Sequence, residues 1–286
     1  MAIELKHLGD WIGRSQTMSE TIAAFPSTAL AATLDRDDPA YTDGTALPPL
    51  WHWLHFLSIH KLEDSGYDGH AALGGFLPPV PLPRRMWAGS RLKWLAPMRI
   101  GRALRKVSTV VSVDHKAGRS GNLVFVKVRH QLFDGDVLGI EEEHDIVYRA
   151  KPEPGSAAPA PSQAPDYSVF SRTISPDPVL LFRYSALTFN GHRIHYDKPF
   201  CTSSDGYPGL VVHGPLLATL MLDLLRRERP QAVVTAFDFR ALAPVFDTHD
   251  FSVHGQPGDN GTVKLWVRRH DGALAMTATA SVKDTI

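Results

Sequence analysis

The densest group of polar side chains in the sequence lies in the segment FRYSALTFNGHRIHYD, residues 182–197. It contains six groups that could donate, accept or transfer a proton: Ser185, Thr188, Asn190, His192, His195 and Asp197. Histidine has a pKa near neutrality and can act as a general base or acid. Asn190-Gly191 is a turn signal. We therefore expect the histidines on a loop at the end of a helix, where functional side chains are common.

A second polar site is expected where a long apolar helix begins. The run HGPLLATLMLDLLRRER, residues 213–229, is apolar enough for a buried helix and ends in basic residues, as the helix dipole favours. Gly214 stands at its start, where backbone N–H groups have no partner within the helix and attract negative charge. Because glycine has no side chain, a carbonyl oxygen could approach this amide closely.

These segments resemble the signature of the MaoC-like enoyl-thioester hydratases. In that family a helix ends in a loop with an acid five residues before a histidine and an asparagine between them. Here His195 is followed by Tyr196 and Asp197, which matches the family's His-x-Asp. Asn190 stands where the family has the acid, and His192 stands where it has the asparagine, so the usual Asp/His pair is not intact.

The residues TFNGHRIHYD (188–197) and GYPGLVVHGPLLATL (206–220) are more similar to one branch of that family. The branch includes mesaconyl-C4-CoA hydratases, itaconyl-CoA hydratases and mitochondrial type-2 3-hydroxyacyl-thioester dehydratases. The first half of the chain resembles the degenerate FAS1-like dehydratase domain that precedes the catalytic domain in this branch. The resemblance covers nearly the whole chain and is strongest at residues 182–225.

The resemblance implies a role for each residue. Adding water to an α,β-unsaturated thioester needs a base for the proton of water and a donor for the enolate oxygen. His195 is the expected general base, Asn190 can hold the water, and the N–H of Gly214 is the expected oxyanion donor, an interaction worth about 2.7–4 kcal/mol. The residues expected to bind substrate are His192, His213, Arg183, Arg193 and Tyr196, with Arg240 as a further candidate cation for a short dicarboxylate.

No cofactor is expected apart from the CoA that the substrate itself carries. A metal site formed by His192, His195 and His213 is the alternative. Neither an HExxH motif nor a cysteine pair accompanies these histidines, so no metal is predicted.

The segment KPEPGSAAPAPSQAPDYS, residues 151–168, divides the chain. Its composition favours an extended, solvated linker. We therefore expect an N-terminal degenerate hot-dog domain at residues 1–150, a linker at 151–168 and a catalytic hot-dog domain at 169–286.

Each half is expected to place helices before strands. The first half predicts helices at 19–34 and 50–62 and strands at 91–100, 103–116, 122–133 and 136–149. The second half predicts helices at 178–189 and 213–229 and strands at 232–245, 250–256, 261–270 and 273–282. RLKWLAPM (91–98) matches DFRALAPV (238–245), and residues 126–136 resemble 265–275, which indicates an internal repeat. A long helix wrapped by an antiparallel sheet, occurring twice, is an α+β double hot-dog fold; two unrelated α+β domains are the alternative.

Three other groups in the first half are expected to have simpler roles. The predicted helix at 50–62, with its tryptophans and histidines, is expected to be buried and to wall an acyl pocket. The acidic residues at 35–38 are expected to form a solvated turn. Four cations could neutralise CoA phosphates or be ordinary surface charges: Arg84, Arg85, Arg91 and Lys93.

Composition limits the class of protein. The chain has 286 residues of which 43% are hydrophobic, which excludes disorder throughout. Thirty basic residues balance thirty acidic ones, so the basic excess of a nucleic-acid binder is missing. The single cysteine, Cys201, excludes an internal disulfide. With no apolar run of about 18 residues we expect no membrane partner, and without a signal-like N-terminus we expect a cytoplasmic location rather than the mitochondrial matrix.

Three functions remain open from the sequence. The favoured one is hydration of a C5 dicarboxylyl-CoA, such as mesaconyl-C4-CoA or itaconyl-CoA, to citramalyl-CoA. The alternatives are a 3-hydroxyacyl-thioester dehydratase of fatty-acid metabolism and a non-catalytic acyl-CoA-binding hot-dog protein, which Asn190 favours. A homodimer is also expected, since hot-dog sheets leave edge strands that commonly pair.

Overall fold

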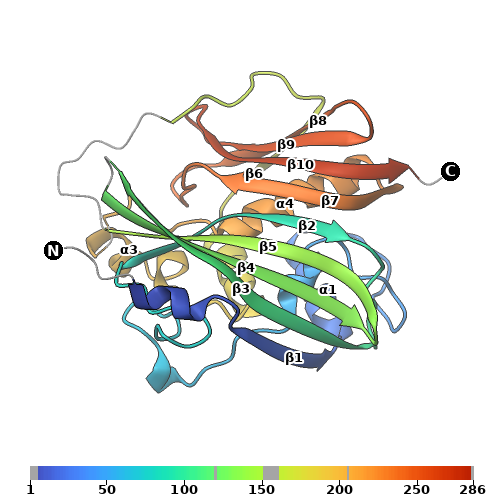
Figure 1. The fold of residues 1–286 in the computed structure, drawn as a ribbon. Helices are drawn as coiled ribbons and strands as arrows, with labels where there is room; N and C mark the ends of the chain where they lie inside the picture. Colours follow the sequence, from blue (N-terminus) through green and yellow to red (C-terminus); the bar gives the residue numbers. More distant parts are fainter. Residues whose placement is uncertain (1–5, 119–120, 151–160, 205, 285–286) are drawn as a thin grey trace.

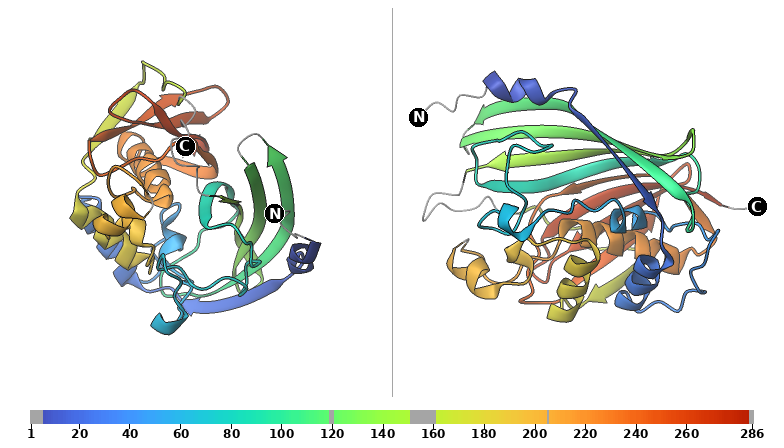
Figure 2. Two further views of the ribbon diagram at one scale, coloured as in Figure 1. Left: turned by 90° about the vertical axis from the view of Figure 1, so that its left-hand side faces the viewer. Right: turned by 90° about the horizontal axis from the view of Figure 1, so that it is seen from below.

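The computed structural model describes residues 6–118, 121–150, 161–204 and 206–284. The described strands form one antiparallel sheet in the order β1-β3-β4-β5-β2-β7-β10-β9-β8-β6 (Figure 1). Viewed from its end, the sheet curves around the helices, which lie on its concave side (Figure 2). The α+β class predicted from the sequence is confirmed.

The first half supplies five neighbouring strands of this sheet. They are β1 (Ser15–Thr21), β2 (Arg84–Trp94), β3 (Ala103–Gly118), β4 (Gly121–Asp134) and β5 (Val137–Arg149). The remaining elements are the helix α1 (Ala24–Thr33) and the 3-10 turns η1 (Lys6–Trp11), η2 (Trp51–Leu54) and η3 (Leu62–Asp64). The strand predictions are confirmed, except that β2 begins and ends six or seven residues earlier than predicted.

The helix predictions for the first half are largely wrong. Residues 50–62 form only the short turn η2, because Leu50 and Phe56 adopt φ angles of 71° and 54° that interrupt a helix. Much of the segment is buried as predicted, but as irregular chain. The helix expected at 19–34 shortens to α1, with Pro26 in its first turn, where a missing N–H costs nothing.

The second half supplies the other five strands and most of the helices. The strands are β6 (Phe170–Ile174), which the sequence analysis did not predict, β7 (Ala232–Ala241), β8 (Phe251–Pro257), β9 (Thr262–Arg268) and β10 (Leu274–Asp284). The helices are α2 (Pro178–Leu187), the 3-10 turn η4 (Arg193–His195), α3 (Lys198–Ser203) and α4 (Gly214–Glu228). The predictions of α2 and α4 are confirmed.

Helix α4 forms the centre of the core. Every residue from Leu216 to Leu225 is buried, which agrees with a helix that is apolar on all sides. Asp223 is the one charged residue in this stretch, and its carboxylate pairs with Arg36 at 2.6 Å, Arg227 at 2.8 Å and Arg172 at 2.9 Å. These pairs connect α4 to the turn after α1 and to β6.

The turn at residues 35–38 is therefore more than a solvated acidic loop. Asp35 and Asp37 are exposed as predicted, but Asp38 is not. Its carboxylate pairs with Arg36 at 2.8 Å and with Arg226 of α4 at 3.3 Å.

The two halves join in the middle of the sheet, where β2 pairs with β7 and Arg91 lies opposite Asp238. The matched Leu-Ala-Pro steps make the same contacts in each half. The N–H groups of Leu95 and Ala96 donate to Gly139 O at 2.7 and 3.2 Å, and those of Leu242 and Ala243 donate to Ala275 O at 2.8 and 3.1 Å. The internal repeat inferred from the sequence is confirmed.

Part of the predicted linker is attached to the second half. Residues 151–160 lie outside the described residues, but Ala164 is buried and its N–H donates to Gly272 O at 2.9 Å. Ser162 O accepts the N–H of Leu274 at 2.8 Å. Residues 162–164 are thus attached to the second half, whereas residues 165–167 are exposed as expected for a linker. None of the helices in the described part of the chain has the length and apolar character needed to cross a membrane.

Candidate active site

The loop after α2 adopts the turn that Asn190-Gly191 predicts. The N–H of Asn190 donates to Ser185 O at 2.8 Å, and Asn190 Oδ1 accepts the N–H of His192 at 3.0 Å. This local turn, of the kind in which an Asn side chain bonds the backbone two residues on, leads into η4. It places His192 and His195 on the inner side of the loop.

His195 is buried and neutral. Its Nδ1 lies 2.7 Å from Val211 O, so Nδ1 carries the proton and donates to the carbonyl. Burial lowers the pKa of His195 to about 4, against the weaker opposing effect of the Val211 hydrogen bond. The second nitrogen, Nε2, therefore keeps a free lone pair at neutral pH and can accept a proton.

His213 lies directly beside this imidazole, and Gly214 follows it in the chain. The rings of His213 and His195 stack with centroids 3.7 Å apart. His213 Nε2 is 2.8 Å from Ser185 Oγ, which fixes the ring; Ser185 thus bonds a side chain as well as closing the turn. Gly214 is the first residue of α4, and no heavy atom lies within 4 Å of the position that a Cβ would occupy there. Space for a substrate carbonyl therefore borders the helix N-terminus.

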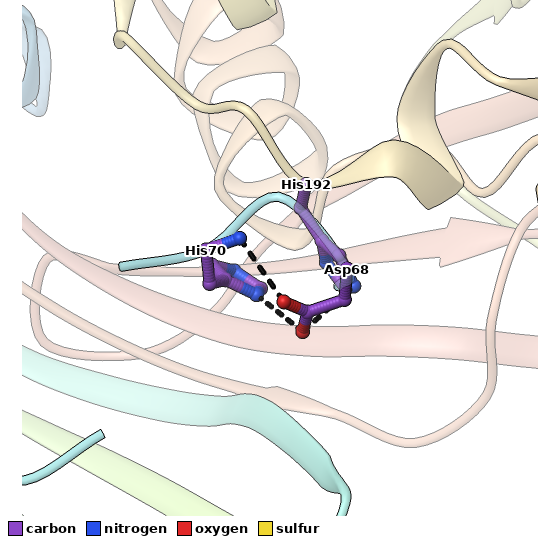
Figure 3. A group of neighbouring side chains, drawn as sticks. All are labelled: Asp68, His70 and His192. Carbon is purple, nitrogen blue, oxygen red and sulfur yellow. Dashed lines mark hydrogen bonds and ion pairs between the residues drawn. The ribbon is translucent and has the colours of Figure 1, made fainter. Parts of the chain in front are cut away.

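The first half contributes Asp68 and His70 to this cluster (Figure 3). Asp68 Oδ1 accepts the backbone N–H of His70 at 3.1 Å, and Oδ2 accepts the Nδ1–H of its ring at 3.0 Å. His192 Nε2 lies 3.8 Å from the same Oδ2, and the centroids of the two imidazole rings are 4.0 Å apart. Neither Asp68 nor His70 was predicted.

The cluster consists of one ionised carboxylate among neutral imidazoles. Burial would raise the pKa of Asp68, but the hydrogen bonds from His70 hold it well below its usual range. Burial lowers the pKa of His70 and of His192, and burial likewise lowers the pKa of His213 far below its usual value. At neutral pH, Asp68 is therefore the charged member of the group.

Asp68, His70 and His192 also form a donor set that could hold a divalent metal ion. One ligand atom from each lies within 4.8 Å of the others. A carboxylate and two imidazoles suit zinc or a similar metal. The set predicted as the metal alternative was different, since it combined His192 with His195 and His213.

In the described part of the chain, the side chains of the other residues predicted to bind substrate form no hydrogen bond or ion pair with the clustered side chains. Arg193 and Tyr196 lie on the loop itself. Arg193 pairs with Asp197 at 2.7 Å and stacks over the ring of Phe200. The hydroxyl of Tyr196 donates to Gly191 O at 2.9 Å and its side chain is exposed. Arg183 on α2 and Arg240 on β7 are exposed.

A different cation, Arg85, acts on the histidines. It is half-buried on β2. Burial lowers the pKa of His70 and of His192, and the charge of Arg85 lowers both further. From the sequence, Arg85 is one of four cations that could neutralise CoA phosphates. Its effect on His192 depends on a contact between the halves, which no local pattern predicts.

Known proteins that are similar to this chain identify its family. The family model for hydroxyacyl-thioester dehydratase type 2 matches residues 50–247. The chain is 45% identical over 276 residues to a mesaconyl-C(4)-CoA hydratase of Chloroflexus aurantiacus, covering 95% of this chain and 96% of the relative.

Solved structures give the fold. A MaoC-like dehydratase of Phytophthora capsici superposes with a TM-score of 0.71 at 14% identity, covering 99% of this chain and all of the other. A Mycobacterium tuberculosis protein described as a double hot-dog fold superposes with a TM-score of 0.58 at 14% identity, covering 96% of this chain and 98% of the other. The predicted double hot-dog fold is confirmed. The chain belongs to the hydroxyacyl-thioester dehydratase type 2 family of MaoC-like hot-dog hydro-lyases.

Proposed function

We propose that this protein adds water to the α,β double bond of a short dicarboxylyl-CoA thioester, with mesaconyl-C4-CoA as substrate and citramalyl-CoA as product. The observation that carries the proposal is the hydrogen bond from His195 Nδ1 to Val211 O, which leaves Nε2 as a base. The 45% identity to a mesaconyl-C(4)-CoA hydratase supports the choice of substrate.

The proposed reaction uses His195 as the base and the backbone amide of Gly214 as the oxyanion donor. His195 Nε2 takes a proton from water as the water oxygen bonds to the β-carbon. The electrons of the double bond move to the thioester carbonyl, where the N–H of Gly214 stabilises the enolate oxygen. The imidazolium of His195 then gives its proton to the α-carbon. The net change is the addition of one water molecule.

Arg85 supports a dicarboxylate as the acyl group. In the C4 thioester of mesaconate, the free carboxylate is bonded to the β-carbon, which is the atom that water attacks. A cation that binds it must therefore lie beside the catalytic histidines, not at the far end of an acyl channel. We take Arg85 as that cation, because its charge is among the smaller effects that lower the pKa of His70 and of His192; its guanidinium also interacts with the hydroxyl of Tyr148. Arg193, in contrast, is already paired with Asp197.

The test is a hydration assay of the purified protein with mesaconyl-C4-CoA and with crotonyl-CoA, which lacks the second carboxylate. We expect the wild type to prefer mesaconyl-C4-CoA, and His195→Ala to lower kcat by about 10²–10⁴-fold on both. Arg85→Gln is expected to raise KM for mesaconyl-C4-CoA at least about 10-fold, the loss of a charged hydrogen bond, with little change for crotonyl-CoA. The matched control Arg129→Gln, at an exposed position on β4, should change neither.

Three results would contradict the proposal in different ways. A preference for straight-chain 3-hydroxyacyl-CoA would indicate a dehydratase of fatty-acid metabolism. Binding of acyl-CoA without turnover of any thioester would indicate a non-catalytic protein. Full activity of His195→Ala would leave an enzyme with another base.

A further inference from the structure

The loop that carries Asp68 and His70 is held against the catalytic loop by backbone contacts. The N–H of Arg193 donates to Asp68 O at 2.8 Å, and its guanidinium donates to Tyr67 O at 3.1 Å. A Cβ at Gly69 would overlap the carbonyl oxygen of Gly191, so the two backbones are in contact there. The first half therefore fixes the Asp68 carboxylate relative to His192 and His195.

Among the described residues, no arginine or lysine pairs with this carboxylate. In the described part of the chain its partners are His70 and, at 3.8 Å, His192. A partly buried charge without a cationic partner costs free energy, and such groups are concentrated at functional sites. The hydrogen bonds of Arg193 already join the two halves at this point. The negative charge of Asp68 is therefore not needed for that contact.

His70 and His195 are anchored in the same way. Each donates from Nδ1, His70 to a carboxylate and His195 to a backbone carbonyl. Each therefore presents Nε2 as an acceptor. His192 lies between them, with ring centroids 4.0 Å from His70 and 5.4 Å from His195.

We propose that Asp68 and His70 complete the catalytic site from the first half of the chain. His70 Nε2 and His195 Nε2 together hold the attacking water, which can donate one hydrogen bond to each. Asp68 is a positioning residue: it sets the tautomer of His70 and balances the charge that forms when His195 takes up the proton. This inference rests on the proposed hydratase function, and it assigns the site to both halves.

The physical reason is the charge change in the reaction. The proton that leaves water converts neutral His195 to an imidazolium, and the same proton later goes to the α-carbon. Near His195 this positive charge is unfavourable, because the site is buried and its other imidazoles are neutral. The anionic Asp68 opposes that penalty. The titratable groups around His195 are His70, His192 and His213, and the charges of Asp68 and Arg85 act on His70 and His192.

The test compares Asp68→Asn and His70→Gln with the wild type on whichever enoyl-CoA the wild type hydrates fastest. Asp68→Asn keeps the size of the side chain but removes its charge. We expect kcat to fall by about 10²-fold in each variant, the scale of a proton-transfer contribution, with KM changed less than about threefold. In Asp68→Asn the acid limb of the kcat profile should move to lower pH, because losing the negative charge lowers the pKa of His195. A purely structural role would not move that limb.

The matched control is Asp64→Asn in η3, an exposed carboxylate near the start of the same segment. It should leave kcat and the pH profile unchanged. Thermal melting checks each variant, and His70→Gln carries the test if Asp68→Asn does not fold.

Three kinds of result would overturn the inference. A wild-type kcat in folded Asp68→Asn and His70→Gln would remove the role of the pair while leaving the hydratase intact. A wild type without turnover on any enoyl-CoA would instead remove the proposed function and this inference together. One equivalent of bound zinc whose removal by EDTA abolishes activity would also overturn it, because Asp68 and His70 would then be metal ligands.

Discussion

At the scale of single residues, the central feature is a histidine that stays neutral well below the usual pH range. Burial lowers the pKa of His195 to about 4, so its Nε2 lone pair is available above that pH. We expect kcat/KM to remain nearly level from pH 7 to pH 5 and to fall below about pH 4 as His195 becomes protonated. A pH–rate profile measured on protein checked for folding at each pH tests this. A midpoint near 6.5 would mean that the reacting imidazole is not buried.

The amide at position 190 gives a second prediction. Asn190→Asp retains the Oδ1 atom that accepts the N–H of His192. On its own we expect it to change kcat only a few-fold, because Asp68 already supplies a carboxylate. In the Asp68→Asn background it should restore at least about 10-fold of the lost rate, since a negative charge returns beside His192. A double variant no faster than Asp68→Asn would show that the charge must come from the first-half loop.

The individual residues of the catalytic loop were predictable because their signal is local. Asn190, His192 and His195 lie within six residues, and Asn-Gly indicates a turn wherever it occurs. Asp68 and His70 were not predictable in this way. They lie more than 120 residues earlier in the chain, and only the docked loops bring them to His192.

At the scale of elements, the contact between the two loops depends on glycine. Gly69 has a φ of 87°, and a Cβ there would overlap Gly191 O. Gly69→Ala should lower the free energy of unfolding by about 1–2 kcal/mol from the left-handed backbone alone. It should also lower kcat, because the loop that carries Asp68 must move.

A control variant, Gly74→Ala, distinguishes backbone strain at a left-handed glycine from displacement of the loop that carries Asp68. Gly74 has a similar φ of 92°, but a Cβ there would meet only Pro79 at 3.7 Å. Gly74→Ala should therefore show a comparable loss of stability in urea unfolding while keeping kcat. Equal loss of kcat in both variants would contradict a specific role for the Gly69–Gly191 contact.

Helices were also predicted correctly where the residues that determine them are close together in the sequence. Helix α2 begins with an Asp177 cap and a proline, and α4 combines Pro215 with an unbroken apolar run, so both could be predicted from the sequence. Residues 50–62 are equally apolar, yet Leu50 and Phe56 take left-handed backbone angles. An apolar run indicates burial, but tertiary packing decides whether it is helical.

At the scale of the whole molecule, Asp223 joins the core helix to both halves. It is buried on α4 and pairs with Arg36 from the first half and with Arg172 and Arg227 from the second. Asp223→Ala should lower the free energy of unfolding by about 3–5 kcal/mol, because it leaves three guanidinium groups without their shared partner. Urea unfolding followed by circular dichroism measures this. Asp250→Ala, at an exposed site, is the control, and an equal effect in both would contradict the assignment.

Association between molecules stays a prediction. Among the described strands, β1 and β6 form the two ends of the sheet order. Light scattering of the purified protein would show whether the expected homodimer forms.

The pairing of β2 with β7, which joins the two halves in one sheet, affects how the sequences of the halves can evolve. The halves repeat the same backbone bonds around their Leu-Ala-Pro steps, as two copies of one ancestor would. In an assembly of identical subunits, every substitution appears twice. In a fused pair, each copy can specialise alone. Here the histidine loop lies in the second half, and the described residues of the first half form no helix as long as α4 but place Asp68 against His192.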